Sequence, residues 1–118
     1  MSAHADDIPA GTAGLFDSLI EDFPDMIHSL DGEGNIVYVN RMGTQLLGYA
    51  RDELCGMNIR QLYPPEILDA VEQGFREVKR TGEKRVESLF LAKDGTRIPV
   101  EIRTVVQCDG HSAFARTF

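Results

Sequence analysis

The chain has 118 residues, 42% of them hydrophobic, and its 12 basic and 19 acidic residues give a net charge of -7. This size suits one domain with a single core, and the negative charge argues against nucleic acid and anionic membranes as partners. No apolar run approaches the roughly 20 residues of a membrane-spanning helix, and residues 1–11 lack the blocks of a secretion signal. Cys55 and Cys108 show no metal-binding or disulfide spacing, so we expect a reduced, cytoplasmic location in which both are small buried side chains.

The N-terminal part is expected to hold a tail and a helix. Residues 1–11 are small, polar and acidic, which predicts a disordered tail. Residues 12–24 place apolar side chains at helical spacing and acidic ones on the other face, which predicts an amphipathic helix that stops before Pro24. Its apolar stripe is a dimer-interface candidate, because only the outer face of a sheet or a second copy of the chain could cover it. The stripe consists of Leu15, Phe16, Leu19, Ile20 and Phe23.

The middle of the chain predicts a hairpin followed by helices. Residues 26–30 and 35–39 are short apolar segments joined by a turn with two glycines, which accept the positive φ that a tight turn needs. Short, irregular helical segments follow, and the Asn40 side chain can cap the first of them. A longer amphipathic helix then runs from Pro65, which suits a first helical turn, to a C-cap at Gly82.

Period-two patterning predicts three strands in the last third of the chain. Residues 84–92 and 96–107 show this pattern, and the Lys-Asp-Gly-Thr junction between them is a strong hairpin signal. Residues 111–118 follow a second turn as the last strand. Pro99 cannot donate to a strand ladder, so it should lie where pairing has lapsed or only just begun. The element order predicts an α+β domain with a five-stranded antiparallel sheet and the helices on one face.

Several blocks in these segments resemble the PAS family, from about Leu15 to Phe118. The blocks are Phe23-Pro24-Asp25-Met26-Ile27, Leu30-Asp31 with Gly34-Asn35-Ile36-Val37-Tyr38-Val39-Asn40, Leu46-Leu47-Gly48-Tyr49 with Asp52-Glu53-Leu54-Cys55-Gly56, Lys93-Asp94-Gly95-Thr96 with Ile98-Pro99-Val100-Glu101, and Gly110. Their order and spacing together carry the resemblance. It implies the strand order 2-1-5-4-3 in a domain over residues 25–118, with the helices cupping a pocket against the inner sheet face.

The resemblance also implies a role: a sensory module of a larger, bacterial-type signal transduction protein, as in two-component phosphorelays. Family members usually finish the last strand with an Asp-Ile-Thr signature that leads into a signalling helix. Here Thr117 stands at the Asp position, between Arg116 and Phe118. We therefore expect the C-terminal output domain to lie beyond this chain, as a kinase, a cyclic-dinucleotide enzyme or a transcription factor.

The same resemblance bears on cofactors. Family light sensors form a flavin adduct through the cysteine of a Gly-x-Asn-Cys-Arg motif, but Ile59 holds that position here, between Asn58 and Arg60. We interpret Asn58 as a helix cap and Arg60 as a surface charge. The chain has no tryptophan to stack on a flavin, and its long helix has no histidine for the family's heme mode. Noncovalent flavin stays open and the cofactor is unknown. His28 is expected in the first strand, on either face, and His111 at the surface.

The sequence shows no catalytic arrangement, because no nucleophile stands beside a base and no carboxylates pair at an interpretable spacing. We expect neither an enzyme nor a metal site. A mostly apolar pocket for a small ligand is expected between helices and sheet if the family fold holds. Its candidate residues are Ser29, Met42, Leu46, Met57, Asn58, Ile59, Leu62, Val71, Phe75, Phe90, Val100, Ile102 and Thr104.

Two hypotheses for the function follow. The first is a sensor that works as a homodimer and passes a ligand-induced shift of its sheet to the output domain. The alternative is a ligand-free homodimerisation and spacer module that aligns output domains. Bound material in a cavity would favour the first hypothesis, and a filled core the second.

Overall fold

The computed structural model describes residues 12–107 and 110–117, so the predictions for the tail over 1–11, for Cys108 and for Phe118 lie outside it. The helical elements are α1 (Thr12–Glu21), α2 (Arg41–Leu47), α3 (Arg51–Leu54), η2 (Ile59–Leu62), η3 (Pro65–Ile67) and α4 (Leu68–Thr81). The strands are β1 (Met26–Asp31), β2 (Ile36–Val39), β3 (Glu83–Leu91), β4 (Arg97–Gln107) and β5 (Gly110–Thr117). None of the helices described is both long and apolar enough to cross a lipid bilayer.

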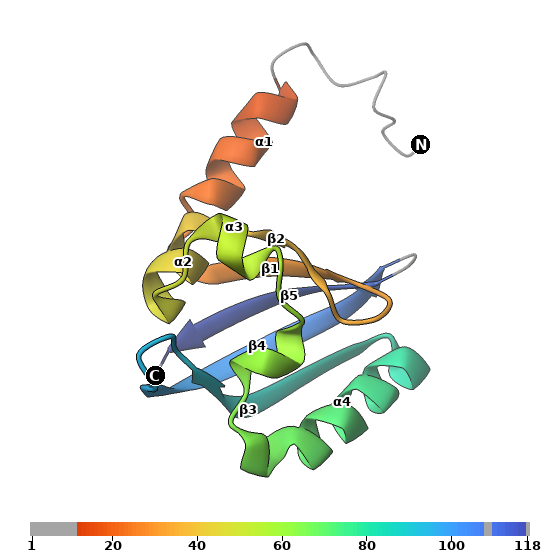
Figure 1. The fold of residues 1–118 in the computed structure, drawn as a ribbon. Coiled ribbons are helices and arrows are strands. Elements are labelled where there is room, and N and C mark those ends of the chain that lie inside the picture. The colour runs from red at the N-terminus through yellow and green to blue at the C-terminus, as the bar shows by residue number, and fades with distance from the viewer. Residues whose placement is uncertain (1–11, 108–109, 118) are drawn as a thin grey trace.

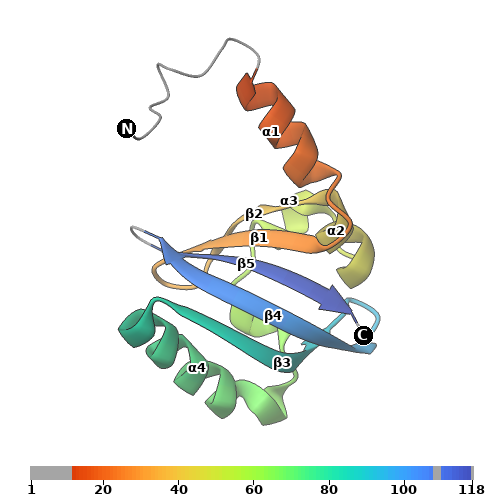
Figure 2. The same cartoon turned by 180° about the vertical axis from the view of Figure 1, so that it is seen from behind.

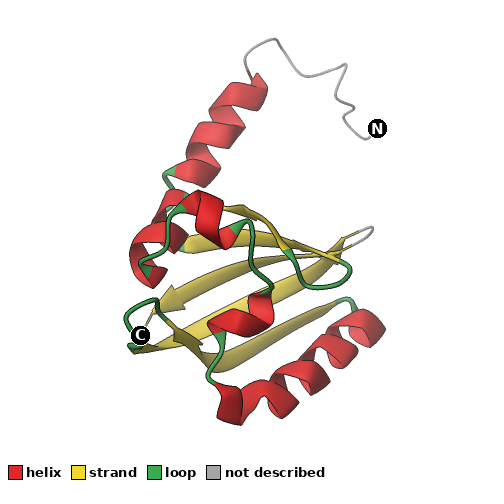
Figure 3. Ribbon diagram, in the orientation of Figure 1, coloured by secondary structure: helices red, strands yellow, loops and turns green. Residues whose placement is uncertain are grey.

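The five strands form one antiparallel sheet in the order β2-β1-β5-β4-β3, which confirms the predicted topology. Figures 1 and 3 show α2, α3 and the 3₁₀ turns on one face of this sheet, with α4 alongside the edge strand β3. Seen from behind, the opposite face of β5 and β4 has none of the described helices across it, and α1 leads away from the sheet (Figure 2).

The strand register defines an inner face toward the helices. Val86 of β3 lies opposite Ile102 of β4, which lies opposite Ala115 of β5, which in turn lies opposite Met26 of β1. Directly opposed side chains share a face of a sheet, so this row forms part of the floor beneath the helices. The buried core consists of Met26, Leu30, Ile36, Val39, Leu47, Leu54, Ile59, Leu62, Tyr63, Phe90, Val100, Ile102, Ala113 and Ala115.

Pro99 is the third residue of β4 and lies opposite Leu89 within the β3–β4 ladder. The described β4–β5 ladder runs from Gln107 to Val100, which pairs with Thr117, and the next position of β5 lies outside the described residues. The place of Pro99 near the start of β4, where pairing has only just begun, agrees with the prediction.

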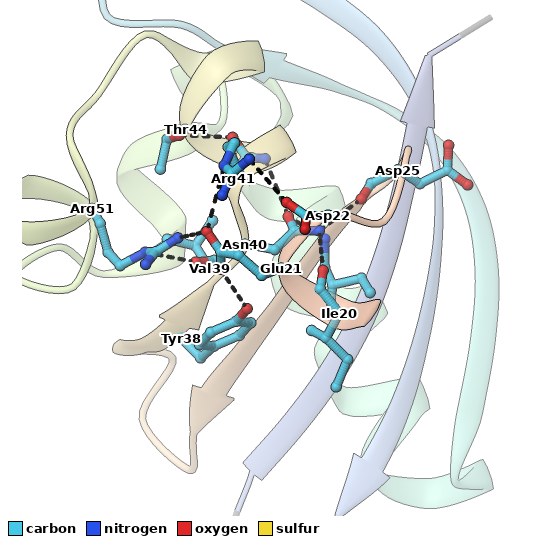
Figure 4. A network of polar contacts seen from close by, with 12 residues as sticks. Ile20, Glu21, Asp22, Asp25, Tyr38, Val39, Asn40, Arg41, Thr44 and Arg51 are labelled. Carbon is cyan, nitrogen blue, oxygen red and sulfur yellow. Dashed lines mark hydrogen bonds and ion pairs between the residues drawn. The ribbon is translucent and has the colours of Figure 1, made fainter. Parts of the chain in front are cut away.

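Asn40 is the central polar residue of the core, with no solvent exposure. Its Oδ1 accepts from the Ile27 amide (2.9 Å) and, as the predicted N-cap of α2, from the Gly43 amide (3.2 Å). Its Nδ2 donates to the carbonyl oxygens of Ile20 (2.9 Å) and Asp25 (3.0 Å). One side chain thus satisfies backbone groups of α1, of the α1–β1 connection, of β1 and of α2 (Figure 4).

Both described histidines of the sheet lie on its inner face. His28 is 3% exposed and contacts the Phe90 ring edge-on, with centroids 6.2 Å apart. His111 was expected at the surface but is only 7% exposed, because its place opposite Leu30 turns it inward, where the Phe75 ring covers it at 5.7 Å. His28 Nδ1 and both ring nitrogens of His111 are buried and have no hydrogen-bond partner within residues 12–107 and 110–117.

Burial controls the protonation of both imidazoles. It lowers the pKa of His28 to about 4. It also lowers the pKa of His111, with a smaller contribution from the Lys79 ammonium. Both rings are therefore neutral in the folded protein at pH 7.

The prediction of a buried Cys55 thiol was wrong. Cys55 is the exposed C-cap of α3, because Leu54, the residue before it, points into the core. Its predicted packing role belongs to Leu54, which is fully buried.

We expect Asn40→Ala to lower the free energy of unfolding by about 3 kcal/mol, because the buried carbonyls and amides that it satisfies would lose their partner. Urea unfolding followed by circular dichroism measures this change. The control is Gln45→Ala, at an exposed position of α2, which should stay within about 0.5 kcal/mol of the wild type. Equal stability of the two variants would contradict the role assigned to Asn40.

The stability should fall as the pH is lowered from about 6.5 to about 4. Unfolded His28 takes up a proton below its ordinary pKa of 6.5, whereas the folded state resists protonation until about pH 4. The shift corresponds to about 3 kcal/mol from His28, and the lowered pKa of His111 acts in the same direction. Urea unfolding at several pH values tests this, with His28→Leu expected to flatten the profile. An unchanged slope in that variant would show that His28 does not cause the dependence.

Candidate functional site

A cavity of about 410 Å³ lies between α4 and the inner face of β3 and β4. We call it the α4 groove. It forms because α4 runs alongside β3 and does not press onto the middle of the sheet (Figure 1). The groove is lined by Tyr63, Ile67, Ala70, Val71, Gly74, Phe75 and Val78 from the helical side, and by Lys84, Val86, Glu87, Ser88, Leu89, Ile102 and Thr104 from the strands.

The walls of the groove follow from the periodicity of two elements. In α4, Val71 and Phe75 are four residues apart and therefore lie on the same side of the helix. On the strand side, Val86 and Ile102 are opposed across β3 and β4. Val86 remains 39% exposed although it lies on the inner face, because the space beside it is the open groove. A ligand in the groove would cover this valine.

Polar groups stand at two places along the groove. Lys84 lies opposite Thr104, and Ser88 lies two inward-facing positions further along β3. The side chains of Ser88 and Thr104 hydrogen-bond to no group in the described part of the chain. Lys84 Nζ donates to the Glu77 carboxylate of α4, and this hydrogen bond lowers the pKa of Glu77. The groove therefore offers two hydroxyls and a cation to a bound molecule.

Tyr63 borders the groove at η2. Its ring packs against Phe90 with centroids 5.3 Å apart, and burial raises the pKa of its hydroxyl. The phenol is therefore neutral and available only as a hydrogen-bonding group.

Arg60 connects the groove to the β1–β2 turn. Its Nε and Nη2 donate to the Glu72 carboxylate of α4, its Nη1 donates to the Glu33 carbonyl oxygen (2.9 Å), and its guanidinium lies 5.4 Å from the centre of the Phe75 ring. The bond from Arg60 lowers the pKa of Glu72. Arg60 was interpreted as a surface charge, but the structure shows a half-buried bridge between α4 and the hairpin turn.

Ion pairs hold the C-terminal end of α1 against the rest of the domain (Figure 4). Glu21 accepts hydrogen bonds from Arg51 and from the Tyr38 hydroxyl, and Arg41 Nη1 lies 2.9 Å from Asp22 Oδ1. Burial opposes the ionisation of Glu21, but the bonds from Arg51 and Tyr38 outweigh it and lower its pKa. The C-terminal turn of α1 is thus held by groups from β2, α2 and α3.

The stripe of α1 predicted as a dimer interface is largely uncovered. Leu15 and Leu19 are 59% and 56% exposed. The Phe23 ring contacts the Phe114 ring on the outer face of β5, with ring centroids 6.0 Å apart. The exposed members are Leu15, Leu19, Ile20 and Phe23, and the side chain of Phe16 lies outside the description.

The predicted pocket residues divide into three groups. Val71, Phe75, Ile102 and Thr104 line the α4 groove. Ile59, Leu62, Phe90 and Val100 are fully buried core residues. Leu46 borders a separate hollow beside Lys93, while Met42 and Met57 are half-buried, and Met57 packs on the core.

Two polar residues that were predicted for the pocket make their hydrogen bonds outside the α4 groove. Ser29 lies on the outer face, where its hydroxyl is 3.1 Å from that of Ser112, because the alternation of β1 turns Met26 and His28 inward. Asn58 is the predicted cap: it accepts from the Arg60 amide (3.1 Å) and donates to the Glu33 carbonyl oxygen (3.0 Å). Neither side chain lines the groove.

Sequence reasoning missed the β3 side of the groove. Lys84, Val86 and Ser88 share the inner face with Phe90, which was predicted. The signal was present, because side chains two residues apart on a strand lie on the same face. Ile67 and Val78, which were not among the predicted pocket residues, also line the groove.

Comparison with known proteins places these features in a family. The family described as PAS fold matches residues 14–114. A curated relative, the methyl sulfide methyltransferase-associated sensor of Methanosarcina acetivorans, is 25% identical over 88 residues, which cover 74% of this chain. The chain spans only 9% of that relative's length.

Solved structures share the fold. A PAS domain from a two-component sensor histidine kinase has a TM-score of 0.80 at 17% identity and covers 93% of this chain and 100% of that domain. The PAS domain, in complex with ethanol, of a transcriptional regulator in the LuxR family from Burkholderia thailandensis has a TM-score of 0.77 at 13% identity, with coverage of 87% and 96%. The sheet order and the match over most of the sequence together show that the chain belongs to the PAS family, whose domains are generally sensory modules of signalling proteins.

Proposed function

We propose that this chain is the sensory module of a larger cytoplasmic signalling protein and that it binds a small, largely apolar molecule in the α4 groove. The observation that carries the proposal is the groove itself: about 410 Å³ between α4 and the sheet, lined by apolar side chains and by hydroxyls that the described chain leaves unpaired. Protein interiors are otherwise closely packed, so a space of this size beside a dense core favours a binding role.

The energetics favour occupation of the groove. Apolar side chains such as Val86 and Val71 face the open space, and covering them stabilises a complex by about 25 cal/mol per Å² of apolar surface. Thr104 and Ser88 add directional hydrogen bonds that would orient a ligand. One structural neighbour is described in complex with ethanol, and this supports the binding of a small molecule within the fold.

The contacts of α4 suggest how occupation could be transmitted. A ligand touches Phe75, and the Arg60 guanidinium that lies over this ring also binds Glu72 and the β1–β2 turn. Movement of α4 would therefore change the packing of this turn. The turn joins β1 to β2, and these strands adjoin the ion pairs that hold α1, so the change could reach α1. In this scheme the ligand shifts the population of two arrangements, and an attached output domain, such as the kinase of a sensor histidine kinase, responds to the shift.

We expect octanol, as an apolar probe, to shift the NMR resonances of Val71 and Ile102 in the wild type. Val86→Trp should fill the groove and weaken this binding by about tenfold or more, equivalent to about 1.4 kcal/mol. The matched control is Val37→Trp, at a 58% exposed position of β2 away from the groove, where binding should be unchanged. Two results would argue against the groove as the binding site: octanol shifts the resonances of residues outside the groove, or Val86→Trp binds octanol as tightly as the wild type.

A second candidate function is homodimerisation, in which α1 and the outer sheet face align two output domains. The exposed apolar side chains of Leu15 and Leu19 favour it, because each would gain about 1.5–3 kcal/mol if fully covered. Phe114, 46% exposed on β5, continues the apolar surface from Phe23 across the sheet. This function requires no ligand and is compatible with the first.

Leu19→Asp should convert a dimer into a monomer with the fold intact, because a carboxylate would replace an apolar contact. Light scattering coupled to size-exclusion chromatography measures the mass of each species. Gln73→Asp, at an exposed position of α4, should leave the dimer unchanged. A monomeric wild type, or a dimeric Leu19→Asp variant, would rule out a dimer built on this stripe.

A further inference from the structure

We infer that the α4 groove selects a monocarboxylate with an apolar chain and that Lys84 binds its head group. The inference rests on the proposed function, because it names the chemical class of the ligand that the groove takes.

The groove has one cationic end. Lys84 of β3 and Thr104 of β4 are directly opposed on the inner face, and both line the groove. Lys84 Nζ already donates to Glu77, but an ammonium group carries three donors. It can therefore bind a second carboxylate while it keeps the first, and the Thr104 hydroxyl beside it can donate to the same head group.

The remainder of the groove is apolar. The next opposed pair along the strands is Val86 and Ile102, and α4 contributes Val71 and Phe75 from the other side. From Lys84 to Ser88, β3 spans about 13 Å at a rise of about 3.3 Å per residue. An extended hydrocarbon chain fits this length with its head group at Lys84.

The charges at the groove distinguish between classes of ligand. Lys84 is the cation among the described lining residues, and its ammonium also binds Glu77. Glu87 borders the groove as well and lies opposite Glu101. A single carboxylate would share the Lys84 ammonium with Glu77, whereas a polyphosphate would bring further negative charges that meet no cation there. A sugar would place hydroxyls against Val71 and Phe75, where they find no partner.

The test compares octanoate with octanol, which share the chain and differ in the charge of the head group. Dissociation constants come from NMR titration of the protein at neutral pH. We expect octanoate to bind about tenfold to a hundredfold more tightly, the range for hydrogen bonds to a charged group. Lys84→Met should abolish the preference for octanoate over octanol, and Lys84→Arg should retain it. Lys79→Met, at an exposed position of α4 that does not line the groove, is the matched control.

The outcomes separate the inference from the proposed function. Binding of octanol and octanoate with equal affinity, or an octanoate preference that survives Lys84→Met, overturns the inference and leaves the groove as a ligand site. Absence of binding by both probes overturns both. The dispersion of the amide resonances in the NMR spectrum verifies that each variant is folded. Glu77→Gln provides a second test: it removes the carboxylate that binds Lys84, so octanoate should bind more tightly.

Discussion

The arrangement of this domain depends on one buried amide. Asn40 has no solvent exposure, and its two polar atoms satisfy amides of β1 and α2 and carbonyls at the end of α1 and before β1. An apolar residue would leave these backbone groups buried without partners, and an aspartate would place a charge against two carbonyl oxygens. The direction of α1, the start of the sheet and the first helix above it are therefore set by the same side chain.

Around this residue the two halves of the domain are packed differently. The half formed by β1, β2, α2 and α3 contains fully buried side chains on every element, such as Met26, Leu47 and Leu54. The half beneath α4 retains open space, with Val86 uncovered and hydroxyls at Ser88 and Thr104. A domain with a densely packed core beside an open groove can hold its shape while a molecule enters. This division is the structural basis of the sensory role that we propose.

Local patterns that depend on backbone chemistry predicted the Asn40 cap and five strands in an antiparallel sheet. The order of the strands was implied by the resemblance to the PAS family and is confirmed. The residues of the groove were harder to predict from the sequence, because they depend on which face of the sheet or helix each side chain lies on. In β1 apolar residues occupy neighbouring positions, Met26 and Ile27, so the phase of the alternation is ambiguous, and Ser29 was assigned inward. His111 follows a turn and was taken as exposed, but its register with Leu30 buries it.

The position of β3 at the edge of the sheet has a consequence for access to the groove. A central strand is held by ladders on both sides, whereas in the described sheet β3 pairs with one strand, β4. The strand that forms one wall of the groove can therefore bend outward while it strains a single ladder, and the rest of the sheet stays paired. The charged side chains of Glu83, Arg85 and Glu87 on the other face of β3 discourage pairing with a foreign strand at this edge. The domain thus combines a deformable entrance with protection against aggregation in one strand.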